Sequence, residues 1–208
     1  MIRIGIICPS EIALRRFIPA LQQAGDCIKC AAIGIASSEE WFGNIESISQ
    51  EQIDEQQSRE RAKAQVFVDQ YGGEIVVGYE NLVSADAIDA VYIPLPPALH
   101  HKWAKKAIEV GKHVFVEKPS TTSLADTEDL IEMASQKGLA LHENYMFIYH
   151  SQLEEINKAL KGTPFEVSYR VLNELTIMVG VMLDEGKELD DAIAQSVNNI
   201  LLMKILPR

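Results

Sequence analysis

The chain has 208 residues, 47% of them hydrophobic, and a formal net charge of -11. This apolar content is enough for the core of one large domain, so we do not expect a disordered chain. The acidic balance disfavours nucleic acid and anionic membrane surfaces as partners, because both bind clustered Lys and Arg. The amino-terminal apolar run, Ile4 to Cys8, is far shorter than the roughly 20 residues of a membrane span and no cleavage site follows it, so we expect a cytoplasmic protein.

The three cysteines, Cys8, Cys27 and Cys30, leave an odd thiol and are typical of a reducing compartment. Cys27 and Cys30 have the C-x-x-C spacing, but they lead into an apolar strand, whereas a redox pair needs a helix start to lower the thiol pKa. We interpret them as a turn cysteine and a strand cysteine. No further ligands lie nearby at a suitable spacing, so we expect no zinc or other metal site.

Hydrophobic periodicity predicts alternating strands and helices through the first two thirds of the chain. Apolar runs indicate six strands, at residues 2–7, 30–35, 74–77, 87–93, 112–116 and 139–142. Helical spacing indicates helices over 12–24, before Tyr71-Gly72-Gly73, through Trp103 to Gly111, and over 123–137. Strands joined by helical crossovers form a doubly wound, mostly parallel sheet, so the predicted fold class is α/β and Rossmann-like.

Two stretches depart from this alternation. Residues 39–61 are rich in Gln, Glu and Ser and predict a surface insertion that leads into a helix and adds no chemistry. After Tyr145 the pattern predicts a helix over 152–160, a strand over 165–172 and two helices broken at Asp184-Glu185-Gly186. We therefore divide the chain into a Rossmann domain, residues 1–147, and a small helical carboxyl-terminal appendage, residues 148–208.

The stretch from Ala90 to Ser120 carries the strongest functional signal. It predicts a strand, a polar loop, a helix, a second strand and a second loop, which together form one βαβ unit. Because parallel sheets bind ligands at the carboxyl ends of their strands, we expect His100, Glu117 and Lys118 to lie close together there. Taken from these residues alone, a surface ion pair between Glu117 and Lys118 is the favoured interpretation.

Four segments together resemble the amino-terminal half of the Gfo/Idh/MocA oxidoreductases, the glucose-fructose oxidoreductase and inositol dehydrogenase group. They are Ile2-Arg-Ile-Gly-Ile, Tyr92 to His100 (YIPLPPALH), Gly111 to Pro119 (GKHVFVEKP) and His142 to Phe147 (HENYMF). The resemblance covers roughly residues 1–170, and the P-x-x-x-H loop combined with the E-K-P motif makes it specific. It implies a Rossmann domain that binds NAD or NADP, a substrate domain in full members, and hydride transfer on a sugar or sugar-derived alcohol.

The resemblance also assigns roles to the loop after the fifth strand. It implies that Lys118 is catalytic, with an ammonium that bonds the reacting hydroxyl and stabilises a developing alkoxide. It implies that Glu117 contacts the nicotinamide ribose and that Pro119 fixes the turn that aims both side chains. With the family taken into account, the site is favoured over the surface ion pair.

The loop after the fourth strand lies along the cofactor in the family. The resemblance therefore makes Leu95, Pro96 and His100 cofactor-binding candidates. His100 is also a candidate catalytic acid, although a lone His is more often a capping or surface residue. We expect His101 to face solvent and His113 to be structural.

The first βα turn departs from the family pattern. Where the family resembles G-x-G-x-x-A, this chain reads Cys8-Pro9-Ser10-Glu11-Ile12-Ala13, and its cofactor-binding candidates are Cys8, Ser10, Glu11 and Ile12. Side chains in place of the two turn glycines are expected to crowd a pyrophosphate, and Pro9 removes an N–H donor. Ser10 can cap the following helix or donate its hydroxyl to a phosphate, and both interpretations stand.

The end of the second strand bears on the choice of dinucleotide. The family commonly has an Asp there for NAD or a Ser-Arg pair for NADP, whereas this chain reads Ser37-Ser38-Glu39-Glu40. Ser37 is the candidate cofactor contact. Two carboxylates without an Arg would repel a 2'-phosphate and accept from a ribose hydroxyl, which mildly favours NAD, although a solvated acidic turn is an equal alternative.

The carboxyl-terminal region is the larger departure. Full members carry a long region with a glycine-rich segment and a D-x-x-x-H-type pair, and nothing between Tyr169 and Arg208 resembles it. The sequence therefore resembles a member whose middle is deleted. Two functions stay open: an NAD(P)-dependent oxidoreductase acting on a sugar-like small molecule, and a non-catalytic dinucleotide-binding or inert remnant. A homo-oligomer is compatible with either.

Overall fold

The computed structural model describes residues 1–145, 177–183 and 186–200, together with positions 151, 155, 158, 159 and 161. The chain divides into two compact units, Met1–Tyr145 and Met146–Arg208, and each is described by itself. The first unit carries the six-stranded sheet and every candidate site residue predicted from the sequence.

The sheet of the first unit has only parallel neighbours. Its strands in chain order are β1 (Ile2–Ile7), β2 (Ile28–Ile35), β3 (Glu74–Val77), β4 (Ala90–Ile93), β5 (His113–Glu117) and β6 (Leu141–Asn144). Their spatial order is β3-β2-β1-β4-β5-β6, so the chain winds outward in one direction from β1 and in the other from β4. The predicted α/β, Rossmann-like fold class is confirmed.

Helices connect successive strands. A π-helical stretch (Ala13–Phe17) and α1 (Ile18–Gln23) follow β1, and short 3-10 turns lie at Gly25–Cys27 and Pro97–Leu99. The other helices of the first unit are α2 (Ser38–Phe42), α3 (Gln50–Tyr71), α4 (Tyr79–Ser84), α5 (His100–Glu109) and α6 (Leu124–Lys137). The polar insertion predicted over residues 39–61 thus forms most of α2 and the first half of α3.

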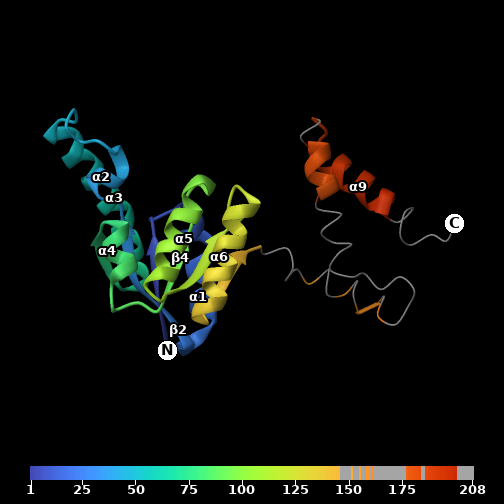
Figure 1. Ribbon diagram of the computed structural model, residues 1–208, viewed down its shortest axis with the longest axis horizontal. Helices are drawn as coiled ribbons and strands as arrows, with labels where there is room; N and C mark the ends of the chain where they lie inside the picture. Colours follow the sequence, from blue (N-terminus) through green and yellow to red (C-terminus); the bar gives the residue numbers. More distant parts are fainter. Residues whose placement is uncertain are drawn as a thin grey trace. The chain divides into compact units, whose positions relative to one another are not determined.

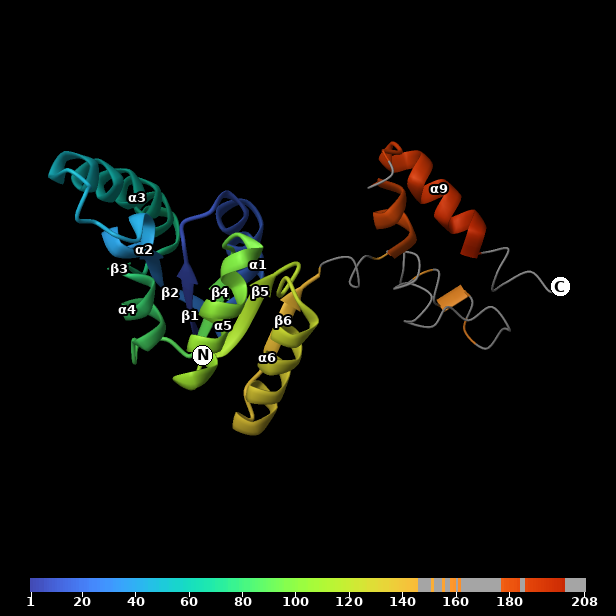
Figure 2. The same ribbon diagram turned by 45° about the horizontal axis from the view of Figure 1, so that its top comes forward.

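Two layers of helices cover the sheet, as Figure 1 and Figure 2 show for the first unit. Successive side chains of a strand point to opposite faces. On one face α1 and α3 pack over Ile4, Ile6 and Ile33, and on the other α4, α5 and α6 pack over Val91 and Val114. Because parallel strands are buried on both faces, they read as continuous apolar runs in the sequence.

The helix after β1 differs from the single α-helix expected over residues 12–24. Residues Ala13–Phe17 form a wider π turn before α1 begins at Ile18. Pro19 lies in the first turn of α1 and has no N–H to give to the preceding turn. We attribute the widened turn to this missing hydrogen bond, since π turns occur where the regular ladder is interrupted.

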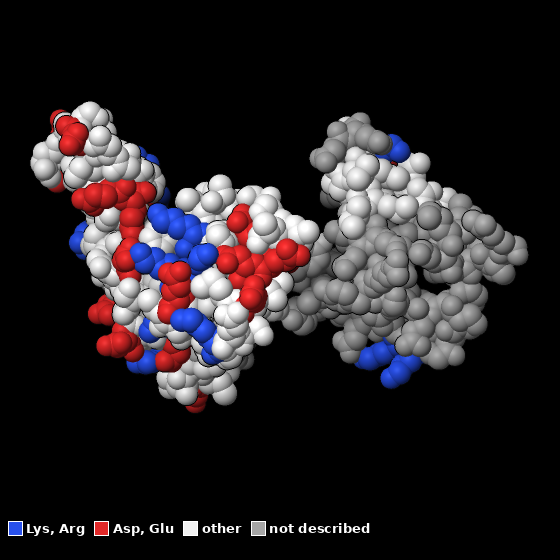
Figure 3. Space-filling model, viewed as in Figure 1, with Lys and Arg blue, Asp and Glu red and all other residues white. Residues whose placement is uncertain are grey.

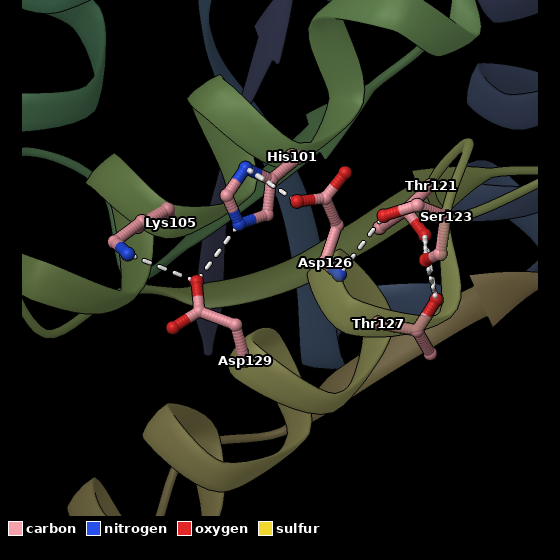
Figure 4. A network of polar contacts seen from close by, with 7 residues as sticks. All are labelled: His101, Lys105, Thr121, Ser123, Asp126, Thr127 and Asp129. Carbon is pink, nitrogen blue, oxygen red and sulfur yellow. Dashed lines mark hydrogen bonds and ion pairs between the residues drawn. The ribbon is translucent and has the colours of Figure 1, made fainter.

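A polar network at the surface joins α5 to α6 (Figure 4). His101 Nε2 lies 2.8 Å from a carboxylate oxygen of Asp129, which also accepts from Lys105 Nζ at 2.9 Å. His101 Nδ1 lies 3.7 Å from a carboxylate oxygen of Asp126. His101, which was expected to face solvent, is partly exposed, and two carboxylates of α6 contact its ring. The network in Figure 4 also includes the hydroxyl side chains of Thr121, Ser123 and Thr127.

The surface over α5 mixes both signs of charge. Figure 3 shows Lys and Arg side chains over this helix flanked by Asp and Glu side chains. Two lysines of α5 are paired, Lys105 with Asp129 and Lys106 with Glu80. The charges of this face are therefore mixed, and several of them are paired.

The cysteines of the C-x-x-C spacing lie in a 3-10 turn and in β2. All three cysteines of the chain are free. Burial raises the pKa of the Cys30 thiol to about 11, opposite to the direction that a redox thiol requires. This agrees with the interpretation of Cys27 as a turn cysteine and Cys30 as a strand cysteine.

Within the second unit the structure describes two helices. Residues 177–183 are helical, and α9 (Leu189–Ile200) follows Gly186, near the break predicted at Asp184-Glu185-Gly186. The strand expected over 165–172 lies outside the described residues, as does most of the helix expected over 152–160. Across the described part of both units, no helix is long and apolar enough to cross a membrane.

Candidate functional site

The candidate site lies at the carboxyl edge of the sheet, beside the neighbouring strands β1 and β4. From β1 the chain goes to β2 on one side, and from β4 it goes to β5 on the other, so the loops that follow them diverge. Open parallel sheets bind ligands at such a switch point. The loops concerned are residues 8–12, 36–40, 94–100 and 117–120.

Cys8, directly after β1, has the backbone conformation of a glycine. Its φ angle is +81°, in a region that residues other than glycine rarely enter. Its amide donates to the Gly34 carbonyl at 3.1 Å. Its side chain packs against the core beside Tyr79, and burial raises the pKa of the thiol. The side chain thus packs against the core while the backbone follows a glycine-like path.

Ser10 caps the helix that follows this turn. Its Oγ accepts a hydrogen bond from the Ala13 amide at 3.2 Å, so one of its two predicted roles is present. The hydroxyl hydrogen remains available to donate. The amides of Glu11 and Ile12 come next, in the first turn at the positive end of the helix dipole. The Glu11 side chain is exposed and pairs with Arg15 at 2.7 Å.

Glu40 organises the loop after β2. Ser37 is the N-cap of α2: its Oγ accepts from the Glu40 amide at 3.2 Å, and the Glu40 carboxylate accepts from the Ser37 amide at 2.9 Å. The same carboxylate accepts from the amides of Tyr79 at 2.8 Å and Glu80 at 3.1 Å, the first two residues of α4. The insertion expected to add no chemistry thus supplies the carboxylate that joins the loops after β2 and β3.

His100 is wholly buried, with an exposed fraction of 0%. Its Nε2 lies 2.6 Å from the Leu95 carbonyl oxygen, and its Nδ1 lies 2.8 Å from the Pro119 carbonyl oxygen. The ring therefore spans the loops after β4 and β5. Both ring nitrogens face backbone carbonyls, which is the geometry of a residue that holds loops in place. Leu95 itself is buried, whereas Pro96 is exposed.

Glu117 ends β5 and is 8% exposed. One of its carboxylate oxygens accepts from the Tyr92 hydroxyl at 2.5 Å and from the Asn144 side-chain amide at 2.7 Å. Burial, followed by the contact with this carboxylate, raises the pKa of the Tyr92 phenol well above its usual value. Glu117 thus joins β4, β5 and β6, and it forms no ion pair with Lys118.

Lys118 is exposed on the loop after β5, and it has no hydrogen bond or ion pair with the described part of the chain. The Lys118–Pro119 peptide bond is cis. His100 contacts the carbonyl of Pro119, and the Ser120 amide donates to the Glu143 carboxylate at 2.8 Å. The Lys118 ammonium, unpaired within the described residues, therefore stands at the edge of the sheet on a loop that is held from two sides.

The structure brings His100 and the Glu117-Lys118 loop together, as the topology predicted. Sequence reasoning missed the long-range contacts of Glu40 and the Tyr92–Glu117 hydrogen bond. The S-x-x-E pattern of Ser37 to Glu40 is a capping-box signal, so the sequence alone indicates the local hydrogen bonds between these two residues. Among the described residues, no group of three or more His, Cys, Asp or Glu side chains is arranged to hold a metal ion.

A doubly wound sheet, a glycine-like turn after its first strand and a capped helix directly beyond define a nucleotide-binding Rossmann domain. Comparison with known families agrees. The Gfo/Idh/MocA model, which describes an oxidoreductase family with an NAD-binding Rossmann fold, matches residues 3–145. The chain belongs to this family.

Several similar proteins act on sugars or sugar nucleotides by name. A dTDP-3,4-didehydro-2,6-dideoxy-alpha-D-glucose 3-reductase of Saccharopolyspora spinosa is 35% identical over 161 residues, which cover 77% of this chain and 41% of the relative. A D-xylose 1-dehydrogenase (NADP(+)) of Haloferax volcanii is 39% identical over 98 residues, covering 47% and 30%. The chain spans about two fifths of the length of the 3-reductase.

Solved structures resemble the same part of the chain. The crystal structure of a 3-ketoreductase from Actinomadura kijaniata, in complex with NADP and TDP-benzene, has a TM-score of 0.61 and 37% sequence identity. The match covers 76% of this chain and 42% of that protein. An oxidoreductase from Thermotoga maritima has the same TM-score at 21% identity and supports the fold alone.

Proposed function

We propose that the chain binds a nicotinamide dinucleotide and acts as an NAD(P)-dependent oxidoreductase on a sugar or sugar-derived alcohol. The observation that carries this proposal is the glycine-like backbone of Cys8 leading into the helix capped by Ser10, at the switch point of the sheet. The sugar-related names of the relatives support the substrate class.

The first turn fits a diphosphate group. A phosphate at the start of the helix would meet the Ser10 hydroxyl and the amides of Glu11 and Ile12, where the helix dipole favours an anion. The Cys8 side chain packs against the core beside this turn. The Glu11 carboxylate is the one opposing charge of this turn, and its ion pair with Arg15 offsets it.

The exposed ammonium of Lys118 is the proton donor of the proposed reaction. A bound nicotinamide supplies the hydride in reduction and accepts it in oxidation. In reduction, Lys118 Nζ donates a proton to the carbonyl oxygen of the sugar as negative charge develops there, and the product is an alcohol. In oxidation, the neutral amine accepts the proton of the hydroxyl group.

Two buried side chains position this lysine. His100 holds the loop of Lys118 through the Pro119 carbonyl, and we assign it to positioning, in place of the acid role expected from the sequence. Glu117 uses one carboxylate oxygen for Tyr92 and Asn144. Its other oxygen has no hydrogen-bond partner among the described residues, so it can accept from a ribose hydroxyl of the dinucleotide.

A second, non-catalytic function is favoured by how little of its relatives' length the chain covers. The chain spans 41% of the length of the Saccharopolyspora relative, and the matched family model ends at residue 145. The candidate that follows is a unit that binds a dinucleotide without turning over a sugar by itself. It shares the binding step with the first proposal and differs only in catalysis.

The substitution Lys118→Met separates the oxidoreductase from the non-catalytic dinucleotide-binding unit. If Lys118 is the proton donor, the variant loses about 100-fold or more of any dehydrogenase or reductase rate, while its dinucleotide affinity stays within about twofold of the wild type. The measurement is the change in nicotinamide absorbance with a panel of sugars and sugar nucleotides. Lys29→Met, on an exposed lysine of β2, is the matched control.

Equal turnover in Lys118→Met and the wild type would exclude the catalytic role. Binding of the dinucleotide by the wild type, without turnover of any sugar in the panel, would favour the second function.

A further inference from the structure

The polar insertion contains a cavity that the proposed function does not use. The cavity lies between α2 and the first half of α3, and these two helices lie side by side in both ribbon views (Figure 1 and Figure 2). Its volume is about 180 Å³, and a cavity of about 150 Å³ can hold one benzene ring. None of the residues that line it is among the candidate dinucleotide contacts.

Gln56 lines this cavity and has a hydrogen-bond donor without a partner. Its side chain is buried, with an exposed fraction of 5%. Gln57 Nε2 donates at 2.9 Å both to the Ala36 carbonyl and to Gln56 Oε1. Because a carbonyl only accepts, the contact with Ala36 fixes the orientation of the Gln57 amide, and the Gln56 atom that faces it is the oxygen.

Gln56 Nε2 is therefore the part of this amide that is left to meet a ligand. It is buried and has no hydrogen-bond partner within the described residues. Leaving a buried donor unpaired is costly, so an acceptor that enters the cavity would be held there.

Glu60 offers the opposite polarity to the same cavity. It lies four positions after Gln56, on the same face of α3, and is 2% exposed. One of its carboxylate oxygens accepts from Lys63 Nζ at 2.7 Å. The other oxygen has no hydrogen-bond partner in the described part of the chain, so it can accept from a cationic donor. A buried donor and a buried carboxylate thus face one small cavity.

The rest of the lining adds a cation and apolar surface. Arg59 is exposed, and it forms no ion pair with the residues that the structure describes. A carboxylate would satisfy both the Arg59 guanidinium and Gln56 Nε2. From α2 the cavity receives Trp41, which is 48% exposed, and Phe42, which is half-buried. These rings supply contact area for an apolar group.

We propose that this cavity is a second ligand site, which binds an α-amino acid with an apolar side chain. The carboxylate of the ligand accepts from Gln56 Nε2 and Arg59, and its ammonium donates to Glu60. Its side chain packs against Trp41 and Phe42. The inference does not depend on the proposed binding of a dinucleotide.

Other classes of ligand fit the lining less well. A simple carboxylic acid would be repelled by Glu60, and a simple amine would leave Gln56 Nε2 unpaired. A neutral sugar could bond the amide of Gln56, but it would give Glu60 and Arg59 no opposite charge. The amino acid is favoured because it answers the donor, the carboxylate and the apolar rings together.

The test is a titration of the full chain with L-phenylalanine, followed by tryptophan fluorescence. The chain has two tryptophans, and Trp41 is half exposed whereas Trp103 is 3% exposed, so Trp41 reports on the cavity. We expect phenylalanine to bind with a dissociation constant below about 5 mM. The analogues 2-phenylethylamine and 3-phenylpropionate each lack one charge and should bind at least about fivefold more weakly.

Two substitutions locate the binding, each with a matched control. Gln56→Met keeps the length of the side chain and removes the donor, so it should weaken phenylalanine binding at least about fivefold. Gln70→Met, on an exposed glutamine of the same helix, should keep the wild-type affinity. Arg59→Gln removes the exposed cation and should weaken binding by a similar factor, whereas Arg61→Gln should not. If Gln56→Met does not fold, the arginine pair decides.

Each remaining outcome overturns a stated part of the inference. Absence of binding of both L-phenylalanine and L-leucine up to about 10 mM overturns the site and leaves water as the partner of Gln56. Binding of glucose in place of phenylalanine, or equal binding of 3-phenylpropionate, overturns the ligand class. Displacement of phenylalanine by NADH would assign the cavity to the dinucleotide and overturn the second site. Binding of phenylalanine without any binding of NADH would overturn the proposed function alone.

Discussion

Cys8 is the residue at which this chain departs furthest from local backbone preference. Its φ of +81° costs a residue with a side chain about 1–2 kcal/mol relative to an ordinary conformation. The hydrogen bond from the Cys8 amide to the Gly34 carbonyl and the packing of the thiol against the core hold Cys8 in this conformation. The conformation keeps the backbone close to the place of the proposed diphosphate, so the strain sits where binding needs it.

A pair of substitutions isolates this backbone effect. Cys8→Gly and Cys8→Ala both remove the thiol packing, but only glycine relieves the positive φ. Alanine is ordinarily the more stable of the two by about 0.5–1 kcal/mol, whereas here we expect the glycine variant to be more stable by about 1 kcal/mol. The free energy of unfolding in urea measures this difference between the two variants. A more stable alanine variant would contradict the assigned conformation.

The candidate site could be predicted from the sequence only in part. The capping role of Ser10 follows from residue type and spacing, and the meeting of His100 with the Lys118 loop follows from the topology. The direction of the Cys8 side chain could not be predicted, because it depends on whether a residue with a side chain keeps the glycine-like backbone angle of this turn. The bonds of Glu40 to α4 could not be predicted either, since they join residues 39 and 40 positions apart.

At the scale of elements, an ion pair joins the starts of β1 and β4. Arg3 and Asp89 make two side-chain bonds, at 2.6 Å and 3.0 Å, and the Arg3 amide donates to the same carboxylate at 2.8 Å. The bonds to Arg3 hold the pKa of Asp89 well below its usual value. This pair fixes the register of the two central strands.

The lowered pKa of Asp89 sets a pH dependence of stability. The contribution is fully present above the pKa of the unfolded chain, about 3.9, and is lost as the pH falls through the folded pKa. We therefore expect Asp89→Asn to lower the thermal midpoint at pH 7 and to flatten its fall below pH 4. Asp129→Asn should have a smaller effect, because Asp129 accepts only from the side chains of Lys105 and His101, whereas Asp89 also accepts from the Arg3 backbone amide. Equal pH profiles for wild type and Asp89→Asn would refute the role.

Element identities were predictable, and their ends were less so. All six strands were expected because buried parallel strands read as apolar runs. β4 begins at Ala90 and not at 87, because Asp89 is engaged with Arg3. β6 begins at Leu141 and not at 139, because the Leu139 amide bonds the Ala134 carbonyl at the end of α6. Such contacts between side chain and backbone, or across a helix end, set boundaries that periodicity leaves open.

At the scale of the molecule, the unit Met1–Tyr145 contains the sheet, both helical layers and every residue of the candidate site. The match to the family model ends at the same residue. The order β3-β2-β1-β4-β5-β6 places the turn of Cys8, the loop of Lys118 and the segment of Glu40 after β2 along one edge of the sheet. The central claim is that this edge binds a nicotinamide dinucleotide.

Titration of NADH and NADPH against the full chain, followed by nicotinamide fluorescence, tests that claim most directly. We predict saturable binding of at least one of them below about 1 mM. Ser10→Asp keeps a good helix cap but places a carboxylate at the phosphate position, so it should weaken binding about tenfold or more without loss of folding. Absence of binding by the folded wild type up to millimolar concentrations, or equal binding by Ser10→Asp, would contradict the account.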